Sequence, residues 1–69
     1  MELTLGTLIK INDPSQNIKG LVGVVLAHDV SNNKVMYRIV ANDYLGKATF
    51  KTNRWNCTVI GRYEGQISL

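Results

Sequence analysis

Short stretches in which apolar and polar residues alternate recur along this chain. After Gly6, the side chains of Ile9 and Ile11 fall on one side of an extended segment, and Lys10 falls on the other side. This period of two is the pattern of a β-strand with one buried face. It predicts a first strand over residues 3–11, with Ile9 and Ile11 in the core.

Four more strands are predicted downstream. Residues 21–28 are nearly all apolar, which predicts a strand that is covered on both faces along its length. Segments 35–40 and 47–51 alternate again, and residues 57–61 form the last strand,. The residues expected on the inner face of the two alternating segments are Val35, Tyr37, Ile39, Ala48 and Phe50, and those on the outer face are Met36, Arg38, Val40, Lys47, Thr49 and Lys51.

Polar segments separate these strands. Residues 12–19 form a loop by composition, in which Pro14 suits the first corner of a type I turn and Ile18 is expected to fold back over the core,. Further turns are predicted at 29–34 and 41–46, where Asn and Asp are frequent,.

The segment before the last strand is too short to form a stable helix. Residues 52–56 therefore predict a single 3₁₀ turn, in which Trp55 is expected to close one end of the core,. Residues 62–69 carry little packing signal and are expected to form a tail that a neighbouring molecule orders,.

Two glycines, Gly20 and Gly23, stand at the entry to the apolar strand at 21–28. Glycine weakens a strand, so its presence here predicts a bulge, a tight bend or a close approach between backbones. Such features curl a short sheet. The pattern as a whole predicts an all-β chain: a small five-stranded barrel over residues 1–61, with one 3₁₀ turn before the last strand and a tail at 62–69.

The composition limits how this barrel is stabilised. A chain of 69 residues forms one domain and buries only about 60% of the surface that it exposes when unfolded. Cys57 is the only cysteine and His28 the only histidine, which excludes an internal disulfide and a typical zinc site. We therefore predict no metal and no cofactor. The core must come from the 45% hydrophobic residues, or be completed by a partner surface or by oligomerisation,.

The sequence also bears on location. The N-terminal segment lacks the basic region of a secretory signal, and no apolar run approaches the 18 or more residues of a membrane-spanning helix,. Together with the single cysteine, these features favour a cytoplasmic protein with no membrane partner.

The order of these features resembles the SH3-like barrel, and within it the KOW type found in ribosomal proteins and transcription elongation factors. The layout is also similar to that of the E subunit of photosystem I. The resemblance covers about residues 5–61 and implies a binding module. The residues that carry it are Gly6, Ile9 and Ile11 in the first strand, Gly20, Gly23 and Val25 in the second, and Tyr37 and Ile39 in the third.

Catalysis needs paired or triadic groups, and the sequence offers none that is convincing. Cys57 opens a strand and is expected to be a small buried hydrophobe, while His28 is expected to be structural,. The segment Gly20-x-x-Gly23 precedes a strand and not a helix, so it is no phosphate-binding loop. We predict that the protein is not an enzyme. The acids lie in expected turns or near the ends of the chain: Glu2, Asp13, Asp29, Asp43 and Glu64.

One group of basic residues points to a specific binding function. Arg38, Lys47 and Lys51 are expected on the outer faces of two adjacent strands, and the net charge is +3. Basic side chains beside a stacking aromatic are typical of nucleic-acid sites, which favours contact with RNA, DNA or a nucleoprotein complex. The full candidate set is Lys34, Arg38, Tyr44, Lys47, Lys51 and Arg54.

The alternative is a protein-docking role as an adaptor, inhibitor or accessory subunit, of the kind that short free-standing barrels of viral or mobile-element genomes resemble. Docking would use the first loop, through Pro14, Gln16 and Ile18, or an open strand edge,.

Overall fold

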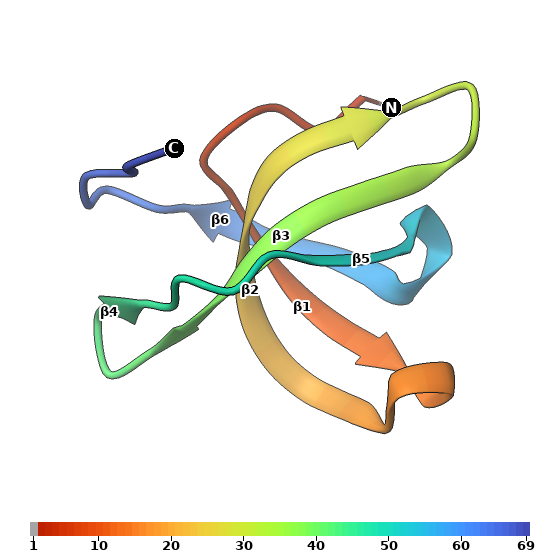
Figure 1. Ribbon diagram of the computed structural model, residues 1–69, viewed down its shortest axis with the longest axis horizontal. Coiled ribbons are helices and arrows are strands. Elements are labelled where there is room, and N and C mark those ends of the chain that lie inside the picture. Colours follow the sequence, from red (N-terminus) through yellow and green to blue (C-terminus); the bar gives the residue numbers. More distant parts are fainter. Residues whose placement is uncertain (1) are drawn as a thin grey trace.

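A computed structural model describes residues 2–69 as one antiparallel sheet of six strands (Figure 1). The all-β prediction is confirmed. Two 3₁₀ turns connect strands: η1 (Pro14–Gln16) and η2 (Arg54–Asn56). The strands are β1 (Thr7–Asp13), β2 (Ile18–Asp29), β3 (Lys34–Ala41), β4 (Tyr44–Leu45), β5 (Phe50–Asn53) and β6 (Cys57–Arg62).

The strand order is β4-β3-β2-β1-β6, and β5 also pairs with β3. The 12-residue strand β2 lies at the centre and curves strongly, so that it pairs with β1 on one side and β3 on the other (Figure 1). Because every strand pair is antiparallel, short turns suffice to connect neighbours,. The predicted 3₁₀ turn before the last strand is present as η2.

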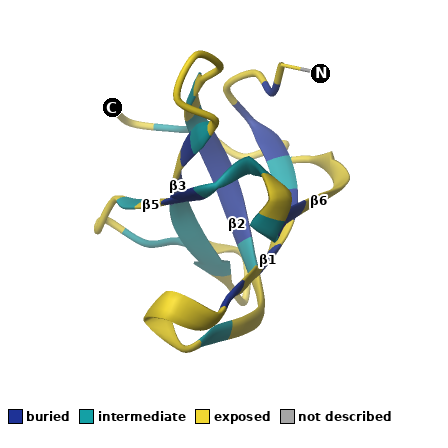
Figure 2. Ribbon diagram, turned by 90° about the vertical axis from the view of Figure 1, so that its right-hand side faces the viewer, coloured by how far each residue is buried: buried dark blue, intermediate teal, exposed yellow. Residues whose placement is uncertain are grey.

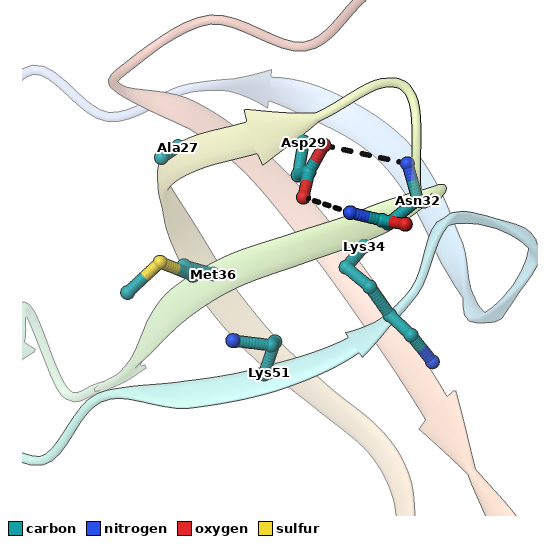
Figure 3. Close-up of a pocket in the computed structure, with 6 residues that line it drawn as sticks. All are labelled: Ala27, Asp29, Asn32, Lys34, Met36 and Lys51. Atoms are coloured by element: carbon teal, nitrogen blue, oxygen red, sulfur yellow. Dashed lines mark hydrogen bonds between the residues drawn. The ribbon is translucent and has the colours of Figure 1, made fainter.

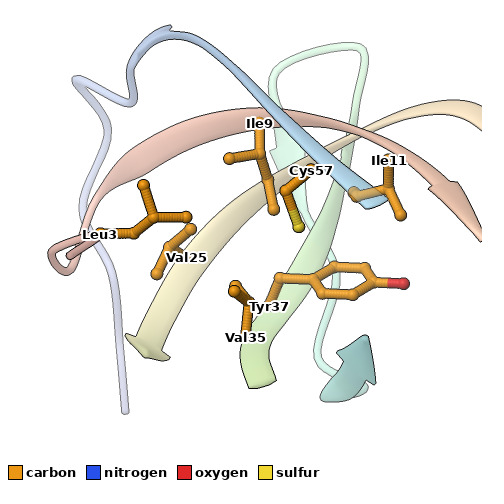
Figure 4. Packing of buried hydrophobic residues seen from close by; sticks show 7 residues of the cluster. All are labelled: Leu3, Ile9, Ile11, Val25, Val35, Tyr37 and Cys57. Carbon is orange, nitrogen blue, oxygen red and sulfur yellow. The ribbon is translucent and has the colours of Figure 1, made fainter. Parts of the chain in front are cut away.

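The core lies on the concave side of this curved sheet (Figure 4). The period-two predictions for β1 and β3 are confirmed, since Ile9, Ile11, Val35 and Tyr37 have no exposed surface. The Tyr37 ring stacks on Phe50, with ring centroids 5.7 Å apart. Buried residues run along β1, β2 and β3, whereas η1 is exposed (Figure 2). The buried cluster is Leu3, Ile9, Ile11, Val25, Val35, Tyr37 and Cys57, with Ile18, Ile39 and Phe50 packed against it.

Both glycines of β2 have the roles that the sequence predicted. Gly20 has a φ of +73° and is the extra residue where the β1–β2 register shifts, so it forms a bulge,. Gly23 lies where three strands meet: a Cβ at this position would stand 2.8 Å from Cδ1 of Ile11 and 2.9 Å from Cδ2 of Tyr37. The curvature of β2 therefore depends on a bend at one glycine and a close contact at the other.

The predicted strand at 47–51 is wrong in its first half. Asn42 and Asp43 both have positive φ and close a tight β3–β4 hairpin,. Four residues then lie between Leu45 and Phe50, opposite only two residues of β3. The Gly46 N–H still donates to the Ile39 carbonyl at 2.7 Å, but residues 47–49 leave the ladder, and Ala48 is exposed rather than buried.

The expectation that Trp55 closes the core is also wrong, because 70% of its side chain is exposed. The residues that flank Trp55 are tied into polar contacts: Asn56 Nδ2 donates to Thr52 Oγ1 at 3.0 Å, and Thr52 in turn donates to Asp13. A polar network of this kind offers no apolar site for an indole ring.

The two ends of the chain contact each other and the sheet. Leu3 is buried, and its N–H donates to Nδ1 of His28 at 2.8 Å, which gives His28 the structural role expected of it. Tyr63 N–H donates to the Gly6 carbonyl at 2.8 Å. The tail at 62–69 thus has partners within its own chain, including Arg38, which donates to the Ser68 carbonyl.

Candidate nucleic-acid interface

Two of the predicted basic residues, Lys34 and Lys51, line one open cavity of about 400 Å³ (Figure 3). Its position follows from strand register, because Met36 of β3 lies opposite Lys51 of β5 and Lys34 lies opposite Asn53. Met36 lines the cavity as well. The other lining residues are Ala27, Asp29 and Asn32.

The positive charge of this cavity is only partly neutralised. Asp29 accepts hydrogen bonds from Asn32 Nδ2 at 2.8 Å and from Ser31 Oγ at 2.9 Å, and these donors hold the pKa of its carboxyl below the usual value. Figure 3 shows Lys51 extending toward Met36, whereas Lys34 extends the other way, where its ammonium donates to Asn53. The lowered pKa keeps the Asp29 carboxylate ionised, and the nearby charge of Lys51 adds to this lowering. The cavity therefore holds two lysines against one carboxylate.

Turn η2, which continues from β5, is held at several points. The Arg54 N–H donates to the Asn33 carbonyl at 2.9 Å, and Arg54 Nη1 donates to the Cys57 carbonyl at 2.9 Å. Asn56 adds the contact with Thr52. Trp55 therefore stands on a fixed turn with most of its ring in solvent. Sequence reasoning missed the exposure of Trp55, although the polar residues around it, Asn53, Arg54 and Asn56, were a signal of it.

Three of the other predicted residues, Arg38, Tyr44 and Lys47, do not join Lys34 and Lys51 at this end of β3. Tyr44, which is 65% exposed, lies on β4 at the opposite end of β3, and Lys47 lies in the connection that follows β4. Arg38 is half-buried between the two ends, and its Nε has no hydrogen-bond partner among the described residues. The six candidates thus divide into Lys34, Lys51 and Arg54 at one end of β3, Tyr44 and Lys47 at the other end, and Arg38 between them.

The residues proposed for protein docking lie around η1. Pro14 and Ile18 line a second open cavity of about 360 Å³ with Asn17 and neighbouring residues. Gln16 has a structural role, because its amide donates to Asp13 Oδ2 at 3.0 Å and to the Lys51 carbonyl at 2.9 Å. Its side chain is therefore engaged within the fold.

The surroundings of Cys57 and His28, the two side chains considered for catalysis, indicate structural roles. Burial raises the pKa of the Cys57 thiol, so the reactive thiolate is disfavoured,. His28 uses Nδ1 as an acceptor, and its Nε2 is buried without a partner among the described residues. Within residues 2–69 there is no cluster of three or more His, Cys, Asp or Glu side chains that could bind a metal ion.

Comparisons with models of protein families, with curated proteins and with solved structures find no match to this chain. No helix in the described part of the chain is both long and apolar enough to cross a membrane. The functional argument therefore rests on the geometry of the surface.

Proposed function

We propose that this domain is a non-catalytic module of the SH3-like type that binds single-stranded nucleic acid. Its binding site is the basic–aromatic surface, which consists of Lys34, Lys51, Arg54 and Trp55. The observation that carries the proposal is the 70% exposure of Trp55 on a turn fixed by backbone and side-chain hydrogen bonds. An exposed indole on a fixed backbone turn offers a stacking platform, and tryptophan loses little side-chain freedom on binding because it has only two χ angles.

The charges of this surface suit a phosphate backbone: Lys34 and Lys51 line one cavity, and Arg54 precedes Trp55 in η2. Lys51 is exposed, and the cavity that it lines holds two lysines, Lys34 and Lys51, against one carboxylate, Asp29. The chain carries a net charge of +3, which adds a favourable long-range attraction to a polyanion. Single strands fit better than duplexes, because only unstacked bases can lie on an indole ring.

A second candidate function is protein docking, which the cavity at Pro14 and Ile18 favours. An accessory subunit or inhibitor would use this cavity without involving Trp55. The two functions therefore differ in which residues they need.

The experiment is a salt titration of binding to oligo(dT) and oligo(U), with wild type compared to Lys51→Glu. Lys10→Glu is the matched control, because Lys10 is exposed on β1 and carries the same charge. With two to three phosphate contacts, we expect a log–log slope of roughly −1.4 to −2.1 with salt, at about −0.7 per contact for single strands. Lys51→Glu should weaken binding to every sequence, and Lys10→Glu should have a smaller effect. Absence of binding at low salt, or equal effects of the two variants, would contradict the proposal.

A further inference from the structure

The last residues of the tail, 64–69, form an end segment that few contacts hold to the sheet. Within residues 2–69 the hydrogen bond of this end segment is the one in which Arg38 Nη1 donates to the Ser68 carbonyl. Ile67 is its half-buried side chain, with Cδ1 3.9 Å from the position of a Cβ at Gly6, and the rest of the end segment is exposed. A segment with so few contacts opens locally at a small cost in free energy.

The end segment lies against the outer face of the sheet, which is the face opposite the core cluster. Val24 belongs to this face and lies opposite Arg38 in the β2–β3 register,. It has no exposed surface, so the outer face is covered here. An open cavity of about 370 Å³ is lined from the sheet by Val22 and Val40 and from the end segment by Glu64. The end segment is therefore part of this cover.

The guanidinium of Arg38 is only partly satisfied in this arrangement. The Ser68 carbonyl accepts from Nη1, whereas Nε is buried with no partner in the described part of the chain. A buried donor without a partner costs free energy. A phosphate accepts from two donors of a guanidinium at once, and hydrogen bonds to a charged acceptor are stronger than those to a neutral carbonyl. Arg38 therefore gains more from a phosphate than from the Ser68 carbonyl.

Arg38 also continues the basic–aromatic surface along β3. On the outer face it follows Met36, which lies opposite Lys51, and two positions along a strand are about 7 Å apart. Figure 3 shows Lys51 extending toward Met36. Lys34 precedes Met36 on the same face. Three cations thus follow one another on this side of β3 and β5, and Arg38 is the one that the end segment holds.

We infer that the end segment is autoinhibitory: its Ser68 carbonyl occupies Arg38, which otherwise binds a phosphate of the single strand next to the one at Lys51. This inference rests on the proposed function and adds a residue and a regulatory contact to that site. The end segment and the phosphate compete for one guanidinium. Nucleic-acid binding is therefore weakened by the fraction of molecules in which the end segment is closed.

The test is a salt titration of oligo(dT) binding to the full chain and to two variants of the end segment. Ile67→Ser removes the half-buried contact and should release the end segment. Leu69→Ser is the matched control, because Leu69 is 82% exposed. Ile67→Ser should bind about fivefold more tightly than wild type, with a log–log slope steeper by about 0.7, which corresponds to one further phosphate contact. Leu69→Ser should bind as wild type does.

A third substitution identifies the guanidinium as the released group. Adding Arg38→Gln to Ile67→Ser should remove the gain in affinity and return the slope to the wild-type value. The backbone amide resonances of residues 64–66, which neither variant changes, should move to random-coil positions in Ile67→Ser and stay in place in Leu69→Ser. An end segment that stays ordered in Ile67→Ser would overturn the inference, and so would a gain in affinity that persists without Arg38.

This inference and the proposed function fail in different ways. If wild type binds oligo(dT) with a dependence on Lys51, and Ile67→Ser and Leu69→Ser bind equally well, the inference is overturned and the proposed function stands. If neither wild type nor Ile67→Ser binds at low salt, both are overturned.

Discussion

The Thr52 hydroxyl donates a 2.6 Å hydrogen bond to Oδ2 of Asp13 and so joins the start of η1 to strand β5, 39 residues further along the chain. Asp13 is buried, and only 3% of its surface is exposed to solvent. Ser15 donates to Oδ1 from both its hydroxyl, at 2.6 Å, and its N–H, at 3.0 Å. Gln16 adds a bond to Oδ2. These donors, with the Ser15 hydroxyl the most important, lower the pKa of Asp13 from 3.8 to about 2.

The first prediction concerns acid stability. Because the pKa of Asp13 is lower in the folded state than in the unfolded state, its contribution to folding is fully present above pH 3.8 and is lost as the pH falls through about 2,. Asp13→Asn should therefore flatten the dependence of the free energy of unfolding on pH between about pH 5 and pH 2. Denaturant titrations at each pH measure this slope.

Two comparisons sharpen this test. Thr52→Val removes one of the donors and should flatten the slope partly. Asp43→Asn changes an exposed carboxylate in the β3–β4 hairpin and serves as the matched control. Asp29, whose pKa is also lowered, keeps some slope in every variant. An unchanged slope in Asp13→Asn would contradict the assignment.

The second prediction concerns the two glycines of β2. Gly23→Ala places a methyl group 2.8 Å from Cδ1 of Ile11, 2.9 Å from Cδ2 of Tyr37 and 3.2 Å from the Arg38 carbonyl. Overpacking of this kind should cost about 1–3 kcal/mol in the free energy of unfolding. At Gly20 the nearest atom is Cε of Lys10, at 3.7 Å, and the cost comes from the φ of +73°.

A pair of variants separates these two causes. Asparagine tolerates the left-handed region better than alanine does, so Gly20→Asn should be more stable than Gly20→Ala. At Gly23 the larger side chain should be worse than alanine, because space is limiting there. Equal stability of Gly23→Ala and wild type would show that the sheet relaxes around the added methyl group.

How far the sequence predicts this fold depends on whether burial is decided locally. In β1 and β3 the period of two decides it, and Ile9, Ile11, Val35 and Tyr37 are buried as predicted. At Ala48 the period of two does not decide burial, because the number of residues between Leu45 and Phe50 exceeds the number available on β3 for pairing. Register mismatch of this kind involves two segments and has no signal in either one alone.

The candidate site shows the same division. The sequence predicted that the strand carrying Lys51 lies beside β3, and the structure places Lys34 and Lys51 at one cavity. Trp55 was misplaced because an aromatic residue before a strand is usually part of a core. Its exposure results from contacts that η2 makes elsewhere: Arg54 with Asn33, and Asn56 with Thr52.

The third prediction concerns Cys57. Because burial raises the pKa of its thiol, the folded protein should react with iodoacetamide at pH 8 at least about tenfold more slowly than the denatured protein. Cys57→Ser should lower stability by about 1 kcal/mol and leave nucleic-acid binding intact. Loss of binding in a folded Cys57→Ser variant would instead give the thiol a functional role.

The last prediction separates a binding role of Trp55 from a structural one. A buried tryptophan that closes a core would cost about 3–5 kcal/mol on replacement by alanine, whereas a side chain that is 70% exposed should cost within about 0.5 kcal/mol,. Stacking of one base is worth about 1–3 kcal/mol, so Trp55→Ala should weaken binding to single strands by roughly 5- to 150-fold.

Trp55→Phe keeps an aromatic face and should retain part of the affinity. Tyr44→Ala is the control, because Tyr44 is 65% exposed at the opposite end of β3. Unfolding midpoints and binding isotherms of all three variants measure both quantities. A destabilised Trp55→Ala variant that binds normally, or a larger loss of binding in Tyr44→Ala, would move the site away from η2.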